Sequence, residues 1–362
     1  MTQEMHNIVV VKIGTNVITR DDGLLDRERL ASIVQQVGLL QKKGKKIVLV
    51  SSGAMAAGRA SVKLSSKLSD VSERQVLSSV GQVELIHSYN DLFKTHGLHC
   101  AQVLATKEDF RDREHYLNMR NCFTALLDEG IIPIVNENDV VSVAELMFTD
   151  NDELAGLVAA MIAAESLILL TNVEGIFDTD PKDPSAKILH TIKDDDMASL
   201  TKCIRPSTSA FGRGGMITKS ETASKAASLG IHTVIASGKR EHILEDIIDG
   251  KPVGTHFLPR KKKSSTMVRW VAAGSTEHRG SVTITAKAKE FITNKEKAVS
   301  LLPIGILNVK GDFEKGDIVK ILDEAGASVG LGRASYGSAR TREILGKAGE
   351  KALIHYDYLF LF

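Results

Sequence analysis

The sequence predicts an α/β protein: an αβα sandwich around a mostly parallel central sheet, followed by a small, mostly β, barrel-like domain. Short apolar runs rich in β-branched residues recur along residues 1–258, and amphipathic stretches with helical periodicity separate them. Strands that are apolar on both faces need cover on both faces, as in a parallel sheet between helices. After Trp270 the pattern changes to alternating segments punctuated by glycines at turn spacing, which predicts a second domain over residues 277–362.

The composition limits the compartment and the partners. At 362 residues the chain is long enough for two or three domains, and its net charge of +1 gives no overall attraction to nucleic acid or membranes. Its three cysteines lie far apart, the start has no signal-peptide pattern, and no apolar run approaches the roughly 20 residues of a membrane span. We therefore expect a cytoplasmic protein without a disulfide framework, a zinc site or a membrane partner.

The predicted strands and helices alternate along the first domain. In the helix at residues 26–43, apolar residues repeat at i, i+3, i+4 and i+7, and Gly44 ends it. In a later helix we expect Val76 and Val83 to face the core, and Pro133 places its strand near a sheet edge or at a strand start. Strands are predicted at residues 8–11, 47–50, 99–104, 131–135, 167–170 and 232–236, and helices at residues 26–43, 73–94, 118–129, 154–164 and after residue 215.

Polar and small residues follow the first two predicted strands. Lys12, Gly14 and Thr15 come after the first, and a small-residue loop that includes Ser52 and Gly53 comes after the second. In open α/β sheets, ligands bind outside the carboxyl ends of the strands. Lys12 therefore lies where chemistry is expected. From this segment alone, the alternative is a lysine that extends from a strand end into solvent.

The segment FGRGGMITK at residues 211–219 predicts a phosphate-binding loop that leads into a helix. Three glycines surround Arg213, and Lys219 lies in the first turns of the helix. Glycines let backbone N–H groups converge on an anion, and a helix N-terminus adds positive potential. The pattern is neither a P-loop nor a dinucleotide-binding fingerprint. For this segment alone, a flexible surface loop before a helix is the alternative.

Two clusters of carboxylates and amides flank a short excursion in the middle of the chain. Residues 136–139 follow the fourth predicted strand, and residues 150–152 open the next predicted helix. Asp150 or Asp152 can cap that helix, but capping does not account for the whole group. Such a group suits a substrate ammonium, or a Mg²⁺-phosphate with lysines nearby.

The loop after the fifth strand predicts a nucleotide-binding lid. That strand ends at Thr171 and Asn172, and residues 173–184 are rich in turn residues with two prolines. Farther on, the acidic run at residues 194–196 favours a solvated helix start over a metal site.

Residues 259–276 predict a basic linker between the domains. The lysine run in PRKKKSS can contact RNA or phosphate, but such runs are more often solvated. Beyond the linker, residues 282–285 and 317–322 alternate as strands do, which supports a compact β domain over residues 277–362.

The two anion-binding loops and the acidic-amide group between them fit phosphoryl transfer. That reaction needs positive charge on the moving phosphoryl group and in-line placement more than covalent chemistry. Lys12 and Lys219 approaching from opposite sides, with Mg²⁺ on the phosphates, would supply both. The chain lacks a Walker A sequence and the protein-kinase motifs, which leaves a smaller class of kinases.

In this order the motifs resemble the amino acid kinase family. The segments VVKIGTNV, VSSGAMAAGR, IIPIVNENDVV, DNDELA, LLTNVEGIF and GRGGMITK follow the family's order, and the tail with SLLPIGI looks like the PUA domain of many bacterial members. The resemblance covers essentially the whole chain. It implies that ATP, with Mg²⁺, phosphorylates the γ-carboxylate of L-glutamate in the first step of proline synthesis. An ionised carboxylate needs no general base.

The resemblance also implies roles for single residues. Lys12 and Lys219 would be the catalytic lysines, with Asp152 organising them. The glutamate contacts would be Ser52, Asp139 and Asn151, and we add Gly53 and Asn136 from the same clusters. The ATP contacts would be Lys12, Gly14, Thr171, Asn172, Arg213, Gly214, Gly215, Met216, Ile217, Thr218 and Lys219. No residue is predicted to be a metal ligand, and position 172 has Asn where many members have Asp.

Two alternatives stay open. One is another acylphosphate-forming kinase of the same fold, such as an aspartate kinase. The other is an RNA-binding protein with an inert kinase-like half, because PUA domains elsewhere bind RNA and Arg269 and the lysines at residues 261–263 could assist. The family also implies a homodimer or homotetramer and feedback inhibition by L-proline. For proline binding, the candidate regions are residues 64–70 and the stretch after Asn138.

Overall fold

The computed structural model divides the chain into two compact units. Unit 1 comprises Met1–Lys263, and unit 2 comprises Ser264–Phe362. No helix in the described part of the chain is both long enough and apolar enough to cross a membrane. Most of the predicted linker and the acidic run at residues 194–196 lie outside the described residues. The structure describes residues 7–64, 68–141, 150–179, 183, 185–193, 215–260, 268, 271, 280–293 and 299–361.

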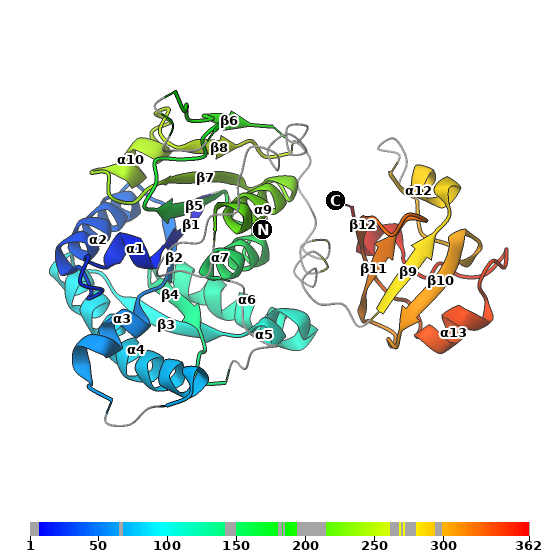
Figure 1. Cartoon of the computed structure of the whole chain (residues 1–362), viewed down its shortest axis with the longest axis horizontal. Coiled ribbons are helices and arrows are strands. Elements are labelled where there is room, and N and C mark those ends of the chain that lie inside the picture. Colours follow the sequence, from blue (N-terminus) through cyan, green and yellow to red (C-terminus); the bar gives the residue numbers. More distant parts are fainter. Residues whose placement is uncertain are drawn as a thin grey trace. The chain divides into compact units, whose positions relative to one another are not determined.

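Unit 1 is built on a mostly parallel sheet, as predicted (Figure 1). Among the described residues, eight strands lie in the order β3-β4-β2-β1-β5-β7-β8-β6. From β3 to β7 all neighbours are parallel, whereas β8 is antiparallel to β7 and parallel to β6. The strands are β1 (Ile8–Ile13), β2 (Lys46–Ser51), β3 (Cys100–Ala105), β4 (Ile132–Glu137), β5 (Ser166–Thr171), β6 (Thr191–Ile192), β7 (His232–Ser237) and β8 (Thr255–Phe257).

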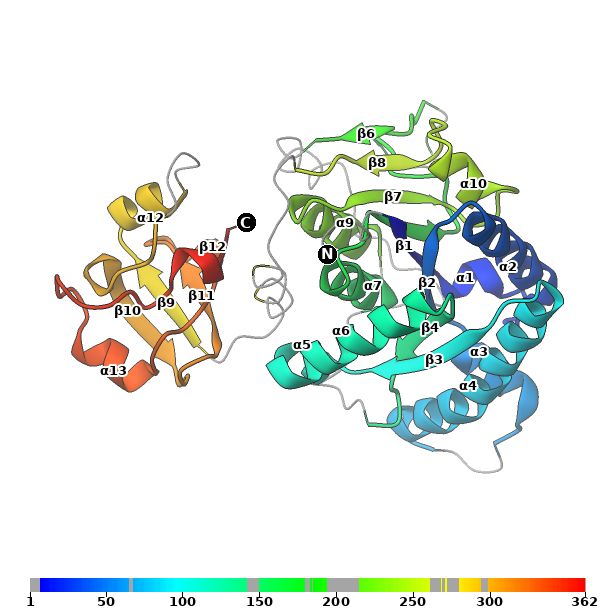
Figure 2. The same cartoon turned by 180° about the vertical axis from the view of Figure 1, so that it is seen from behind.

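Helices cover both faces of this sheet (Figures 1 and 2). The main hydrophobic cluster joins α1, α2, α4 and α10 to one face, while α6, α7 and α9 pack on the other. The helices are α1 (Thr15–Ile18), α2 (Arg27–Lys42), α3 (Ala54–Ser61), α4 (Asp70–Thr95), α5 (Lys107–Arg111), α6 (Arg113–Asp128), α7 (Asn151–Met161), α9 (Met216–Ser228) and α10 (Ile243–Ile248).

The central strand β1 shows how the alternation of a strand places a functional side chain. All six of its residues are buried. Val9, Val11 and Ile13 belong to the cluster with α2. Because successive side chains of a strand point to opposite faces, Val10 and Lys12 lie on the face that α7 covers. Lys12 is therefore a buried lysine and not one that extends into solvent.

Two helices begin earlier than the sequence predicted, because capping residues precede the apolar pattern. Helix α4 begins at Asp70, where the Ser69 side chain accepts from the N–H of Ser72. Helix α6 begins at Arg113 and is capped in the same way by Asp112. Side-chain caps satisfy backbone donors of the first turn, so they fix the start of a helix independently of its core residues.

The buried face of α4 also differs from the prediction. Val76 and Val83 are 39% and 69% exposed, so the expectation that they face the core is wrong. The buried face carries Ser78 and Gly81 instead, because α3 packs against this part of α4 at very close range. A Cβ on Gly81 would lie 1.7 Å from the carbonyl oxygen of Ala54 in α3.

Pro133 is the second residue of β4, and its position fits the predicted strand start. On one side β4 pairs with β3 along its length, but on the other side pairing with β2 begins only at Ile134. The missing N–H of proline therefore falls where the ladder to β2 has not yet begun.

Unit 2 is mostly β, as predicted. Its described strands form one mixed sheet in the order β10-β9-β11-β12-β13, in which only the β9–β11 pair is parallel. A separate core, which includes Val282 and Phe313, packs inside this unit. Its elements are β9 (Gly280–Ile284), α12 (Ala286–Thr293), η4 (Pro303–Gly305), β10 (Ile306–Gly311), β11 (Ile318–Leu322), β12 (Ser328–Arg333), α13 (Ser338–Glu343), η5 (Tyr356–Tyr358) and β13 (Leu359–Leu361).

The close approach of α3 and α4 predicts that Gly81→Ala destabilises unit 1. The added methyl group meets backbone atoms of α3, so the helices must separate, at a cost of about 2 to 3 kcal/mol or more. Gly38→Ala in α2 is the matched control, because its Cβ would meet the nearest atom at an ordinary 3.5 Å. There the better helix propensity of alanine adds up to about 1 kcal/mol. Urea unfolding of both variants measures the difference, and equal stability of the two would refute the close contact.

Candidate active site

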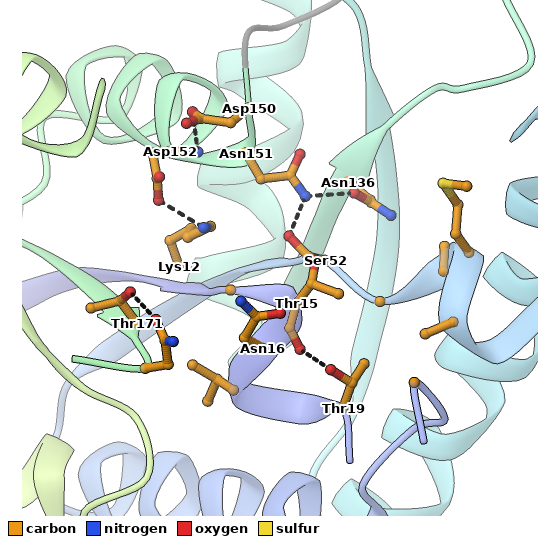
Figure 3. A pocket seen from close by; sticks show the side chains of 18 of the residues that line it. Lys12, Thr15, Asn16, Thr19, Ser52, Asn136, Asp150, Asn151, Asp152 and Thr171 are labelled. Carbon is orange, nitrogen blue, oxygen red and sulfur yellow. Dashed lines mark hydrogen bonds and ion pairs between the residues drawn. The ribbon is translucent and has the colours of Figure 1, made fainter. Parts of the chain in front are cut away.

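The predicted site residues meet at the carboxyl edge of the sheet. Residues at the ends of β1, β2, β4 and β5 line one cavity of about 820 Å³. The N-terminal turns of α7 and α9 also contribute to its lining, and Figure 3 shows the residues at the start of α7. Parallel strands bring their carboxyl ends to the same edge, so residues far apart in the sequence share this cavity. The predicted residues that line it are Lys12, Gly14, Ser52, Gly53, Asn136, Asp139, Asn151, Asp152, Thr171, Asn172, Gly215, Met216 and Lys219.

A carboxylate that holds two lysines lies at the centre of the cavity wall. Lys12 Nζ lies 2.7 Å from Asp152 Oδ1, and Lys219 Nζ lies 2.8 Å from Asp152 Oδ2. Asp152 is fully buried, and Lys12 and Lys219 are only 5% and 8% exposed. Lys12 comes from β1 and Lys219 from α9, so one carboxylate fixes ammonium groups from two different elements. Figure 3 shows the contact with Lys12.

The two lysines keep Asp152 ionised despite its burial. Burial alone would raise the pKa of this carboxyl, but the charges and hydrogen bonds of Lys12 and Lys219 outweigh it and lower the pKa to about 2. Two ammonium groups and one carboxylate leave a net charge of +1 on this trio. Ammonium groups that a carboxylate already holds in place can stabilise the negative charge of an incoming phosphoryl group without first being reoriented.

Asp150 caps α7 and ties it to α9. Its Oδ1 accepts from the N–H groups of Asp152 and Glu153, each at 3.0 Å, and its Oδ2 accepts from Thr218 Oγ1 at 2.9 Å. Of the two candidate caps in the sequence, Asp150 is therefore the one that caps. Burial and the nearby charge of Asp152 raise the pKa of Asp150. Because the cap joins the first turns of both helices, it sets Asp152 beside Lys219.

Amide side chains join the ends of β2, β4 and α7. Asn151 Nδ2 donates to Ser52 Oγ at 2.9 Å and to Asn136 Oδ1 at 3.0 Å (Figure 3). Asn136 Nδ2 in turn donates to Gln82 Oε1 of α4 at 2.9 Å. Ser52 accepts from Asn151, so its own hydroxyl hydrogen points elsewhere and is available to an acceptor in the cavity. The adjacent Gly53 has φ +102°, in the left-handed region, and is the N-cap residue of α3.

Asp139 lies in the cavity as part of an ion-pair cluster. Arg74 of α4 donates to Asp139 Oδ1 and, at 2.9 Å, to Glu137 Oε2. The three side chains are 8–15% exposed, so this cluster is largely withdrawn from solvent. Charge-assisted hydrogen bonds in such surroundings are among the stronger polar contacts in proteins.

The opposite side of the cavity carries the residues predicted to bind ATP. Thr171 Oγ1 donates to Asn172 Oδ1 at 3.3 Å at the end of β5. A Cβ on Gly14 would lie 3.1 Å from the carbonyl oxygen of Leu170 and 3.5 Å from Lys12 Nζ, so glycine keeps the lysine approachable. Ile217 and Thr218 do not line the cavity. Arg213 and Gly214 lie outside the described residues.

Comparison with known proteins decides the family. The model of the amino acid kinase family matches residues 7–237, and the model of the PUA domain matches residues 280–355. The chain belongs to the amino acid kinase family. The family resemblance inferred from the motifs is thereby confirmed, together with the fold class.

Individual relatives agree with this assignment over the full length. A protein named glutamate 5-kinase from Bacteroides thetaiotaomicron is 46% identical over an alignment that covers 100% of both chains. A second glutamate 5-kinase, from Chlorobaculum tepidum, is 47% identical over 98% of this chain and 97% of its own. The solved carbamate kinase from Giardia lamblia bound to AMP-PNP has a TM-score of 0.52 over 70% of this chain and 99% of its own, at 18% identity, and shares the fold.

Some residues of this amino acid kinase site could not be inferred from the sequence. Arg74 and Gln82 belong to α4, outside every motif, and only the packing of α4 brings Arg74 to the cavity and Gln82 to Asn136. The hydroxyl of Thr218, a predicted ATP contact, donates to Asp150, and no motif indicates this link. The one local signal was the pair Gly58 and Gly81, whose lack of a side chain permits the approach of α3 and α4.

The centre of the site predicts that Asp152→Asn destabilises the protein. The amide has the size of the carboxylate but removes the charge that both buried ammonium groups contact, which costs about 3 to 5 kcal/mol. Asp128→Asn is the control, because Asp128 pairs with Lys46 at the surface, where such pairs contribute at most about 1 kcal/mol. Chemical denaturation near pH 7 measures both variants.

The same substitution has a signature in acid. In the folded protein the pKa of Asp152 is about 2, below its ordinary value of 3.8. The ionised carboxylate therefore adds its full contribution to the free energy of unfolding above pH 3.8, and this contribution is lost as the pH falls toward 2. The Asp152→Asn variant should lack this segment of the stability–pH curve. A variant whose curve still parallels the wild type between these pH values would contradict the assignment.

Proposed function

We propose that this protein transfers the γ-phosphoryl group of ATP to the γ-carboxylate of L-glutamate, giving L-glutamyl 5-phosphate and ADP. This is the first step of proline synthesis from glutamate. The observation that carries the proposal is that the buried Asp152 holds Lys12 and Lys219 in one cavity, which most of the predicted glutamate and ATP contacts also line. Full-length relatives named glutamate 5-kinase support the choice of acceptor.

The chemistry needs no proton transfer. An oxygen of the γ-carboxylate attacks the γ-phosphorus, the bond from that phosphorus to the β–γ bridging oxygen breaks, and ADP leaves with the electron pair. A carboxylate is ionised at neutral pH, so no general base is required. What the reaction needs is stabilisation of the charge on the equatorial oxygens of the transferring group. Lys12 and Lys219 supply it from positions that Asp152 has already fixed, so little reorganisation accompanies the reaction.

The polar groups on the other side of the cavity would hold L-glutamate. Asp139 and Asn151 would bind the α-ammonium group, and the hydroxyl of Ser52 with the backbone of Gly53 would bind a carboxylate. The hydrogen bond from Asn151 supports this role of Ser52, because it leaves the serine hydroxyl to act as a donor. Asn136 would orient Asn151 through their shared hydrogen bond.

A magnesium ion would enter with ATP. Among the described residues, no group of three or more His, Cys, Asp or Glu side chains is placed to hold a metal ion. Both oxygens of Asp152 contact lysines, and those of Asp150 cap α7 and contact Thr218. The described residues therefore do not fit a metal held by the protein alone. When bound, Mg²⁺ would neutralise charge on the β- and γ-phosphates.

Further partners stay predictions of the family assignment. These are inhibition by L-proline, a homodimer or homotetramer, and RNA binding by the PUA domain. Of the regions named for proline, residues 65–67 and 142–149 lie outside the described residues.

The direct test of the function is to trap the product. The purified chain is incubated with MgATP, L-glutamate and hydroxylamine, which converts an acyl phosphate into a hydroxamate. The hydroxamate is measured as its coloured complex with Fe³⁺, while ADP release is followed in parallel. We expect hydroxamate with L-glutamate in proportion to ADP, and little with L-aspartate. Hydroxamate formed only with L-aspartate would support an aspartate kinase, and none with either amino acid would refute the proposal.

We predict that Lys219→Ala and Lys12→Ala lower kcat far more than they raise KM for glutamate. Each lysine would act mainly on charge that develops in the transition state, so kcat should fall about 100- to 1,000-fold. Lys43→Ala is the control, because Lys43 pairs with Asp249 at the surface. A lysine variant that keeps near-full turnover would exclude that lysine from the mechanism.

A further inference from the structure

Arg74 is a partly buried arginine in the wall of the cavity. Arg20 and Arg59 also line the cavity, but both are exposed, whereas the Arg74 side chain is only 15% exposed. It reaches the cavity from α4 and contacts Asp139 and Glu137, which follow one another closely at the end of β4. None of the motifs that identify the family includes it.

The position of Arg74 is set by contacts along α4. Its neighbour Gln75 donates to the carbonyl oxygen of Val140 at 2.9 Å, just beyond Asp139. Two turns later, Gln82 accepts from Asn136. The close packing of Gly81 on α3 fixes α4 against the helix whose N-cap residue is Gly53. Helix α4 therefore holds the guanidinium at a set distance from the Ser52–Gly53 loop.

Two trios of charged side chains with opposite net charge line the cavity, and Asp150 lies beside the first of them. The trio of Lys12, Lys219 and Asp152 has a net charge of +1, whereas Arg74 with Glu137 and Asp139 has a net charge of −1. In the proposed reaction the γ-carboxylate must lie beside the lysines, where the phosphoryl group arrives. The head group of the amino acid, with its ammonium and its α-carboxylate, then lies near the second trio.

We propose that Arg74 binds the α-carboxylate of the substrate and thereby selects a complete amino acid head group. This inference rests on the proposed function, since it names the residue that recognises one part of L-glutamate. When the α-ammonium group engages Asp139, the guanidinium exchanges that partner for the neighbouring α-carboxylate. The fork of an arginine matches a carboxylate with two parallel hydrogen bonds.

Glu137 explains why one arginine has two carboxylate partners. A buried charge that loses its only partner is costly. When Asp139 turns to the ammonium group, Glu137 still balances the guanidinium, so the exchange leaves no charge alone. With Arg74 on the α-carboxylate, Ser52 and Gly53 are left for the γ-carboxylate.

Selectivity between two nearly isosteric substrates tests the proposal. The α-amide of L-glutamate keeps the ammonium group and the γ-carboxylate but has no charge on the α-carboxyl group. For the wild type we expect kcat/KM to be about 30- to 100-fold lower for the amide than for L-glutamate, as for a lost charged hydrogen bond. In Arg74→Gln, kcat/KM for L-glutamate should fall by a similar factor because KM rises. The kcat/KM values of the two substrates should then differ by no more than about fivefold.

Further variants distinguish recognition of the α-carboxylate by Arg74 from a purely structural role of this residue. Arg74→Lys keeps the charge but loses the fork, so its selectivity should be intermediate. In Asp139→Asn, kcat/KM should fall by the same factor for L-glutamate and its amide. The kcat/KM of L-2-hydroxyglutarate, which lacks the ammonium group, should change little. Thermal unfolding of each variant reports whether it is folded.

The outcomes decide the proposal separately from the function. If Arg74→Gln lowers kcat/KM for L-glutamate and for its amide by the same factor, Arg74 only supports Asp139 and the proposal is wrong. If the wild type phosphorylates L-glutamate but does not distinguish it from the amide, the proposal is wrong while the function stands. If the wild type phosphorylates neither, the proposed function itself fails. Should Arg74→Gln not fold, the selectivity of Arg74→Lys decides, and unchanged selectivity there overturns the proposal.

Discussion

The contact of one buried carboxylate with two lysines is the interaction on which the rest of this structure depends. Asp152 has no exposed surface and holds Lys12 of β1 and Lys219 of α9 with its two oxygens. Each ammonium group, left alone at this depth, would be costly, and the carboxylate would be equally costly without them. The strand, the N-terminus of α7 and the N-terminus of α9 must therefore keep a fixed arrangement. The cap from Asp150 to Thr218 reinforces it.

A second charged cluster lines the same cavity, and in the proposed reaction it would hold the amino acid. The trio of Lys12, Lys219 and Asp152 has one positive charge in excess, and the trio of Arg74, Glu137 and Asp139 has one negative charge in excess. In the same cavity, Asn151 links Ser52 to Asn136 by hydrogen bonds from one amide nitrogen. A site of this kind can orient an ionised acceptor and stabilise developing charge without a base, since the acceptor carries no proton to remove.

Much of the fold could be predicted from the sequence because its signals are local. Short apolar runs placed β1, β2 and β5 to within about a residue or two, and the polar residues at their ends placed the site at the carboxyl edge. The starts of α4 and α6 were missed because caps, not core residues, set them. Lys12 was ambiguous from its own segment, and burial on the α7 face resolves it. Arg74 and Gln82 could not be found, since only the packing of a distant helix gives them their neighbours.

A crystal structure with AMP-PNP, Mg²⁺ and L-glutamate tests the central claim most directly. The account predicts that the Nζ atoms of Lys12 and Lys219 both lie about 3 Å from oxygens of the γ-phosphoryl group, on different sides of it, while Asp152 stays beside them. The acceptor carboxylate should lie in line with the bond that breaks. A complex in which both lysines remain on Asp152 and neither approaches the γ-phosphoryl group would contradict it.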